Sequence, residues 1–144
     1  MKNLNILTIA FMVILGFSCK NDLNNAPEFL ISKKWILLGF INNETRVDEI
    51  KPDNLKEMNI EFSDNNRFYA VSSCNYFHGY YLINHQCIKI DSLFSTEMYC
   101  INDTIRTWEE KYFNGLKNAA TFNFTGVTLA IKTNSNKEMI FRAE

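Results

Sequence analysis

No block of basic residues occurs anywhere in this 144-residue chain, and its charges nearly cancel. Lys and Arg number 15 and Asp and Glu number 16, which gives a formal net charge of −1. Proteins that bind nucleic acid usually carry a concentrated basic surface, so this balance argues against a nucleic-acid partner. Histidine is scarce too: His78 and His85 are accompanied by no further ligands at a metal-binding spacing, so we expect no metal ion.

Long apolar runs are also missing, except near the N-terminus. Residues 6–17 are apolar apart from Thr8 and Gly16, and they follow the basic Lys2. As a helix, these twelve residues would span roughly 18 Å, well short of a hydrocarbon core of about 30 Å. A basic start, a short apolar stretch and a small residue before a cleavage point are typical of an export signal. We therefore predict a signal peptide over residues 1–18.

Cys19 directly follows Ser18 at the predicted cleavage point. This order resembles the lipobox of bacterial lipoproteins, which implies acylation of Cys19 with fatty acids such as palmitate. Stable anchoring needs more than one acyl chain. We predict a polar tether over residues 19–28 and one globular domain over residues 29–144. The expected location is the cell envelope, anchored in a membrane, most naturally the outer membrane on its periplasmic side or at the cell surface. Secretion with a free Cys19 is the alternative.

Aromatic residues make up 14% of the chain, most of them Phe and Tyr, and both residue types favour strands. Glycine is scarce, with five residues. Apolar character and alternation predict strands over residues 35–41, 58–62, 67–72, 76–83, 87–90, 120–124, 127–131 and 138–142. Polar residues favour turns at 63–66, 84–86 and 134–136, and a long connection over 42–56.

Helical spacing replaces alternation later in the chain. Apolar residues from Ile105 through Trp108 and Tyr112 to Leu116 predict one amphipathic helix over residues 103–117. Strands joined by short connections, with a single helix, indicate an α+β fold in which an antiparallel sheet curls round the helix. The apolar helix face would then fill the concave side of the sheet.

One sequence motif spans the second half of the chain. It begins with Cys-Asn-Tyr-Phe-His-Gly-Tyr, continues with Thr-Glu-Met-Tyr-Cys and ends in the predicted helix. The positions that carry it are Cys74, Asn75, Phe77, Gly79, Tyr80, Thr96, Met98, Cys100 and Glu109. The motif resembles that of the META domain, the module of HslJ-like bacterial envelope lipoproteins. Trp35 fits the opening strand of that family, whereas Ser73 stands where the family usually has glycine.

The resemblance implies a small β-barrel or half-barrel with one helix, in the cell envelope, linked to stress response and without established catalysis. The residues themselves suggest structural roles. Gly79 would allow a close backbone approach, and Asn75 could satisfy backbone groups where a strand begins. A bulge near Gly79 would place both Phe77 and Tyr80 on the core face.

Three cysteines remain once Cys19 is assigned to lipid. Outside the cytoplasm such thiols tend to pair, but three cannot all pair within one chain. A disulfide between Cys74 and Cys100 would stabilise the fold by roughly 3.5 kcal/mol and leave Cys87 as the free thiol. Pairing of Cys87 with either of the other two stays open, as do two reduced, buried thiols.

Three functions are compatible with the sequence. The first is a non-catalytic binding or stress-response accessory protein, without a cofactor, whose partner is an envelope protein or an apolar ligand. The second is a carrier of a lipid or other apolar ligand, in a cavity lined by Phe62, Phe68, Phe122 and Phe124. The third is a hydrolase of envelope polymers, which would use His78 or one of two adjacent carboxylate pairs, Asp48 with Glu49 or Glu109 with Glu110.

Overall fold

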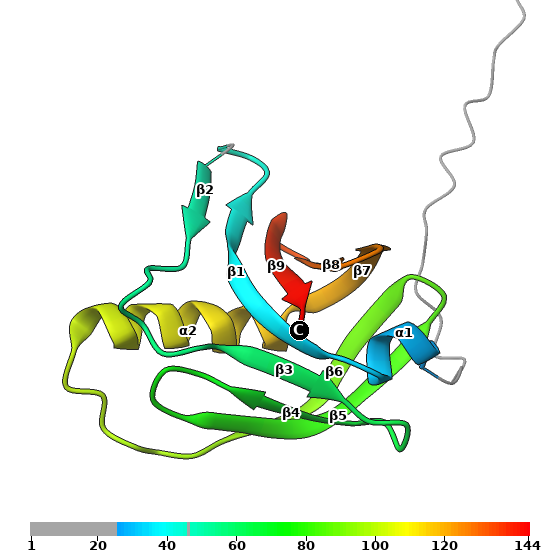
Figure 1. Ribbon diagram of the computed structural model, residues 1–144, viewed down its shortest axis with the longest axis horizontal. Helices are drawn as coiled ribbons and strands as arrows, with labels where there is room; N and C mark the ends of the chain where they lie inside the picture. Colours follow the sequence, from blue (N-terminus) through cyan, green and yellow to red (C-terminus); the bar gives the residue numbers. More distant parts are fainter. Residues whose placement is uncertain (1–25, 46) are drawn as a thin grey trace, which may run out of the picture.

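Eight antiparallel strands close into a barrel in the computed structural model of the protein, which describes residues 26–45 and 47–144 (Figure 1). A ninth strand, β2, pairs with β1 at the edge of the barrel. Helix α2 packs against the barrel. The elements are α1 (Glu28–Ile31), β1 (Lys34–Asn42), β2 (Val47–Ile50), β3 (Asn59–Phe62), β4 (Arg67–Val71), β5 (Tyr76–Asn84), β6 (Cys87–Ser95), α2 (Asp103–Lys117), β7 (Ala119–Thr125), β8 (Thr128–Thr133) and β9 (Lys137–Ala143).

Pairing of the first strand with the last closes the barrel. β1 pairs with β3 on one side and with β9 on the other. The predicted α+β class, an antiparallel barrel packed on one amphipathic helix, is therefore confirmed. The predicted signal peptide, the lipid attachment at Cys19 and the tether as far as residue 25 lie outside the described residues. Within the described ranges, no helix combines the length and apolar character needed to cross a membrane.

Local sequence explains where α2 begins and which side it buries. The side chain of Asn102 accepts hydrogen bonds from the backbone N–H groups of Thr104 and Ile105, at 2.8 and 3.2 Å, and so caps the helix. Trp108, Tyr112 and Leu116 are buried, one turn apart, on the face toward the barrel. The predicted helix over residues 103–117 has the bounds of α2.

Tyr112 fills the interior of the barrel from the helix side. Its ring lies 5.7 Å from that of Phe77 on β5 and 6.3 Å from that of Phe141 on β9. Its hydroxyl donates a hydrogen bond of 2.8 Å to the backbone carbonyl of Asn59 on β3. One helical side chain thus contacts three strands around the barrel, and the helix closes this part of the core.

The short helix α1 covers another part of the core. The indole N–H of Trp35 donates to the carbonyl of Leu30 at 3.0 Å. The ring of Phe29 stacks on that of Phe124, with the centroids 4.2 Å apart. Figure 1 shows α1 on the opposite side of the barrel from the start of α2. The largest fully buried side chains are Trp35, Tyr81, Tyr112, Phe77, Phe141, Leu30, Leu37 and Met58.

A bulge explains why β6 extends well beyond the predicted strand over 87–90. Tyr80 pairs with Ser92 whereas Tyr81 pairs with Ile90, so Asp91 is an extra residue on β6. The extra residue shifts the alternation of inward and outward side chains. The apolar pattern therefore stops at Ile90 although the strand continues.

The same bulge corrects the prediction for Tyr80. Phe77 is 1% exposed, but Tyr80 is 44% exposed on the outside of the barrel. The prediction that a bulge near Gly79 brings both rings to the core is wrong, because the extra residue lies on β6 and β5 keeps its regular alternation.

The predicted long connection over residues 42–56 contains a strand, β2, that the sequence did not predict. Residues 47–50 pair antiparallel with residues 39–42 of β1. Gly39 allows the two strands to meet: a Cβ atom at this position would lie 2.2 Å from the backbone oxygen of Glu49. β2 is short and mixes charged with apolar residues, so its sequence lacks an alternating pattern.

Gly79 is required for a close approach of β5 and β6. A Cβ atom at Gly79 would lie 1.7 Å from the backbone oxygen of Ser92. We predict that Gly79→Ala lowers the free energy of unfolding by about 2–3 kcal/mol, because the strands must separate. Urea denaturation measures this loss. Gly126→Asn is the control, because a Cβ atom at Gly126 would meet nothing within 4 Å and asparagine tolerates its φ of 65°. This substitution should change the free energy of unfolding by less than about 0.5 kcal/mol. An equally mild effect of Gly79→Ala would contradict the argument.

Tyr81 makes the fold sensitive to alkaline pH. Burial, reinforced by the charge of Asp64, raises the pKa of Tyr81 to about 12, and its hydroxyl donates to the carbonyl of Ser63 at 2.7 Å. In the unfolded chain tyrosine ionises near pH 10, so between about pH 10 and 12 the unfolded state binds fewer protons than the folded state. We predict that the free energy of unfolding falls over this range. Urea denaturation at increasing pH measures this fall. The free energy of unfolding of Tyr81→Phe should fall less steeply than that of the wild type, whereas Tyr76→Phe, at an exposed position, should follow the wild type.

Candidate functional site

The residues of the sequence motif converge where β5 begins, and Asn75 is at their centre. Asn75 is 5% exposed. Its side-chain oxygen accepts hydrogen bonds from the backbone N–H of Met98 at 2.8 Å and from the hydroxyl of Thr96 at 2.7 Å. Its side-chain nitrogen donates to the carboxylate of Glu109 at 2.6 Å. We call Asn75, Thr96, Met98, Glu109 and the Cys74–Cys100 pair the motif cluster.

Glu109 reaches the motif cluster from α2 and uses both carboxylate oxygens there. One oxygen accepts from the side chain of Asn75, and the other accepts from the backbone N–H of Asn75 at 2.8 Å. The second oxygen also contacts the hydroxyl of Ser72. Hydrogen bonds to a charged acceptor are the stronger kind. Glu109 therefore ties the helix to the start of β5, and this role explains its place in the motif.

No sequence pattern predicted a role for Ser72. Its hydroxyl accepts from the backbone N–H of Asn75 at 2.9 Å, and its backbone N–H donates to the carbonyl of Asn75 at the same distance. The neighbouring Ser73 is buried, and its hydroxyl donates to the carbonyl of Lys56 at 3.3 Å. Ser73 has no positive φ, so the position needs no glycine. Ser72 lies outside the motif and belongs to no recognisable spacing, so the sequence offered no signal for it.

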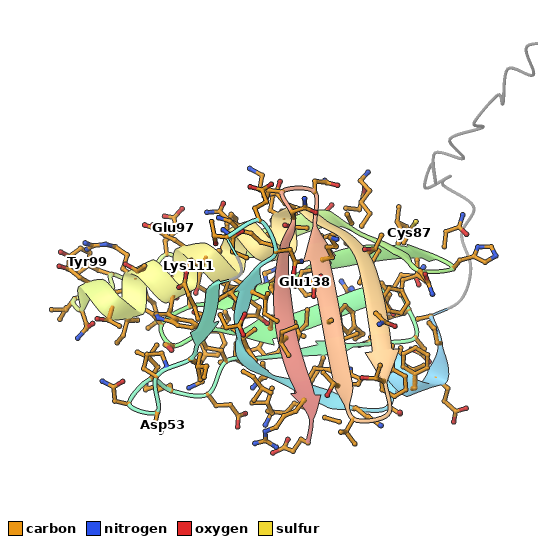
Figure 2. The ribbon with its side chains drawn as sticks, turned by 90° about the horizontal axis from the view of Figure 1, so that it is seen from above. Asp53, Cys87, Glu97, Tyr99, Lys111 and Glu138 are labelled. Atoms are coloured by element: carbon orange, nitrogen blue, oxygen red, sulfur yellow. A yellow bond between two sulfur atoms is a disulfide. The ribbon has the colours of Figure 1, made fainter. Side chains whose placement is uncertain are left out.

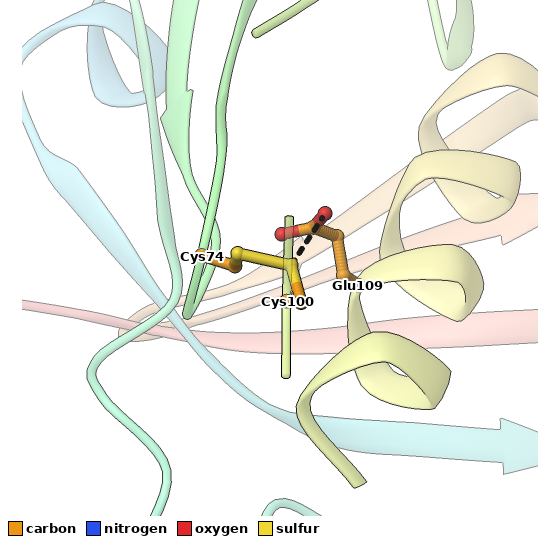
Figure 3. Close-up of side chains that lie close together, drawn as sticks. All are labelled: Cys74, Cys100 and Glu109. Carbon is orange, nitrogen blue, oxygen red and sulfur yellow. Dashed lines mark hydrogen bonds between the residues drawn. A yellow bond between two sulfur atoms is a disulfide. The ribbon is translucent and has the colours of Figure 1, made fainter. Parts of the chain in front are cut away.

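A disulfide joins Cys74 to Cys100 beside the carboxylate of Glu109 (Figure 3). The two residues are 26 positions apart, and closing a loop of that length contributes roughly 3.5 kcal/mol in the chain-entropy description. The disulfide holds the loop before α2 against the start of β5. Among the described residues no cysteine is free, so the expectation that Cys87 is left as a free thiol is wrong.

The motif cluster also contains a group with metal-like geometry. The sulfur atoms of Cys74 and Cys100 and a carboxylate oxygen of Glu109 lie within 4.8 Å of one another. Cysteine binds metals as a thiolate, whereas both sulfur atoms here are consumed by the disulfide. In this oxidised state the group has one carboxylate to offer and does not form a metal site.

The candidate catalytic residues do not converge. His78 is exposed on β5 and stacks on Phe94 with the ring centroids 5.5 Å apart. Glu109 points into the motif cluster while its neighbour Glu110 is exposed. Glu49 forms an ion pair with Lys111 on α2. Glu109 and Glu49 therefore each have a structural partner, whereas Asp48 and Glu110 are exposed.

The four phenylalanines proposed to line a carrier cavity are part of the packed core instead. Phe62, Phe68 and Phe122 are 2, 3 and 6% exposed. The fourth, Phe124, stacks on Phe29 of α1. These side chains fill space between the strands, so they do not provide the walls that the carrier hypothesis requires.

A groove lies elsewhere, on the outside of the barrel between β1 and residues 48–57. Its volume is about 610 Å³, within the range of small-molecule sites of roughly 300–1,000 Å³. The residues lining it include Ile36, Leu38, Ile50, Leu55, Asp48, Asp53, Lys51 and Arg142. Asp53, one of these lining residues, lies on a projecting loop (Figure 2). Its lining mixes apolar residues with charges of both signs.

Comparison with known proteins gives one family and several solved structures. The family model of the META domain matches residues 32–144, which confirms the resemblance drawn from the motif. An NMR structure of a protein from Burkholderia xenovorans aligns with a TM-score of 0.67 and 15% identity, over 88% of this chain and 97% of that one. No curated protein matches the sequence significantly.

Two further structures have the same fold. A crystal structure of a DUF4847 family protein from Bacteroides vulgatus aligns with a TM-score of 0.60 and 14% identity, over 80% of this chain and 94% of that one. An NMR structure of another protein aligns with a TM-score of 0.63 and 20% identity, over 81% and 93% of the two chains. At these identities the likeness concerns the fold alone.

Loss of the Glu109 carboxylate should destabilise the protein strongly. Glu109→Ala leaves the backbone and side-chain N–H groups of the buried Asn75 without their acceptor, so we expect the free energy of unfolding to fall by about 2–3 kcal/mol. Chemical denaturation measures the change. Glu110→Ala is the matched control, because Glu110 is exposed on the same helix, and its effect should stay within about 0.5 kcal/mol. Equal effects of the two substitutions would show that the motif cluster does not stabilise the fold.

Proposed function

Since this chain belongs to the META domain family, we propose that it is a lipid-anchored accessory protein of the bacterial cell envelope, without catalysis of its own. The observation that carries the anchor is in the sequence. Cys19 follows a short apolar stretch and a small residue, and a polar, Asn-rich segment separates it from the barrel. The family assignment supports an envelope role in stress response.

The geometry of the motif cluster supports the absence of catalysis in this proposal. A catalytic acid or base must be able to reach a substrate proton. The Glu109 carboxylate is instead occupied by Asn75 and Ser72, and the two motif cysteines are oxidised to a disulfide. The motif therefore acts on the fold: it fixes the helix and the loop before it.

The anchor would join the barrel through α1. The chain enters the barrel at this helix, and the loop between β6 and α2 lies on the other side of the molecule (Figure 1). Anchoring by a tether at α1 therefore directs the surface near that loop away from the membrane. That surface is the part of an anchored protein that partners in the envelope reach most easily.

Acylation of Cys19 is tested by metabolic labelling. In cells that express the full chain and are fed an alkyne analogue of palmitate, we expect the wild-type protein to be labelled and to sediment with membranes. Cys19→Ser should be unlabelled and should leave the membrane fraction, because the acyl acceptor is lost. The control Glu110→Ala, at an exposed position of α2, should keep both the label and the membrane location.

The accessory role is tested by complementation of a strain that lacks the gene. In a deletion strain challenged with detergent or an envelope-active antibiotic, the wild-type gene should restore growth and Cys19→Ser should not.

Labelling of Cys19→Ser, or a wild-type protein recovered without lipid, would contradict the anchor. Full rescue by an unanchored variant would separate the role from the membrane.

A further inference from the structure

Exposed aromatic rings gather on the outside of β4, β5 and β6. Tyr69, Tyr76 and Tyr80 are 46, 43 and 44% exposed, and Phe94 is 55% exposed. Large apolar groups that cluster on the surface of a soluble domain usually mark a binding surface. We call this surface the aromatic face and define it by Arg67, Tyr69, Tyr76, His78, Tyr80 and Phe94.

Strand register explains why these side chains are neighbours. Tyr69 on β4 lies directly opposite His78 on β5, which lies directly opposite Phe94 on β6. With neighbouring strands about 4.8 Å apart, this row of rings runs roughly 10 Å across the barrel wall. Arg67 and Tyr80 form the next pair along β4 and β5. The aromatic face therefore lies on three neighbouring strands, β4, β5 and β6, whose order Figure 1 shows.

Contacts between the side chains hold the aromatic face in shape. The rings of Tyr69 and Tyr76 stack at 5.9 Å with an angle of 22° between their planes. His78 and Phe94 stack at an angle of 26°. The guanidinium of Arg67 lies 5.5 Å from the ring centroid of Tyr80 and donates a hydrogen bond of 3.4 Å to its hydroxyl. Side chains that are already ordered lose less entropy when a ligand binds.

The charge of the aromatic face decides against nucleic acid. Arg67 is its only residue with a permanent charge, and the carboxylate residue Glu61 lies opposite Tyr69 at its edge. Binding to a phosphate backbone depends on several Lys or Arg side chains that replace counterions. The low charge of the aromatic face therefore favours a ligand that is itself close to neutral.

The remaining chemistry of the aromatic face suits a sugar chain. Tyrosine offers an apolar ring together with a hydroxyl that can donate and accept hydrogen bonds. Ser92, opposite Tyr80 on β6, adds a hydroxyl beside the rings. Val71, at the end of β4, adds a half-buried aliphatic side chain. Pyranose rings likewise combine an apolar C–H face with hydroxyl groups.

The open form of the surface indicates a chain rather than a small molecule. The groove of about 610 Å³ lies on β1 and residues 48–57, on other elements of the barrel. The aromatic face lies instead on the outside of three adjacent strands, across which an extended ligand can lie. We propose that the aromatic face binds a neutral polysaccharide chain along this strip. The inference goes beyond the envelope anchor and does not depend on it.

Calorimetric titration of the purified full-length protein tests this inference. The probes are the neutral hexasaccharides cellohexaose, chitohexaose, mannohexaose and xylohexaose. We expect at least one to bind with a dissociation constant below about 1 mM, and the double variant Tyr69→Ala/Tyr76→Ala to weaken binding by at least about tenfold. Tyr99→Ala is the matched control, because Tyr99 is 83% exposed but lies in the loop before α2, and it should bind as the wild type does.

Three other outcomes would overturn the inference, once a stability control has excluded unfolding of the variant. The substituted rings lie on the surface, so the double variant should stay folded at the titration temperature, as its thermal unfolding curve checks, and lost binding then reports the surface rather than the fold. Failure of every hexasaccharide to bind would exclude a neutral glycan. Self-association of the wild type that the double variant abolishes, with all sugars silent, would assign the aromatic face to contact between two copies. Binding of oligothymidylate that salt removes would assign it to nucleic acid.

Discussion

The hydrogen bonds between Glu109 and Asn75 are the constraint on which the arrangement of helix and barrel depends. Asn75 also accepts from Thr96 and Met98, so one amide joins the start of β5, the loop after β6 and helix α2. The acceptor is charged and the site is mostly buried, which makes these bonds costly to lose. With the helix fixed at this point, Tyr112 is positioned three residues further on, inside the barrel.

The disulfide adds a covalent restraint to the same junction. Cys74 precedes Asn75, and Cys100 closes the loop that carries Met98. A hydrogen-bond network lowers the energy of the folded state, whereas a crosslink mainly restricts the unfolded chain. The two devices therefore stabilise one junction through different states of the protein. This explains why a single sequence motif contains both cysteines together with Asn75 and Glu109.

The sequence predicts those features that depend on neighbouring residues. The bounds of α2 follow from apolar spacing and from a cap that reaches only two or three residues, and the turn residues Asn66, His85 and Asn136, all with positive φ, lie where polar residues favour turns. Resemblance to a family identifies the residues of the motif cluster. It does not identify their partners, because the bond between Asn75 and Glu109 joins positions 34 residues apart.

Features created by a partner strand were not predictable in this way. The bulge at Asp91 is defined by how β6 pairs with β5, so no pattern within either strand reveals it. β2 exists because β1 offers it an edge at Gly39, and its own four residues show no alternation. A glycine inside a predicted strand was the available signal, since it often marks a close backbone approach. Its meaning depends on which strand approaches.

Regular alternation along β5 separates two kinds of role within the motif. Phe77 points into the core and contacts Tyr112, while its neighbours Tyr76 and His78 point outward into the aromatic face. Inward side chains determine stability because their removal leaves cavities, and exposed ones contribute little to it. Residues adjacent in sequence can therefore be altered independently. A loss of function at Tyr76 without a loss of stability would then reflect binding, whereas at Phe77 the two would fall together.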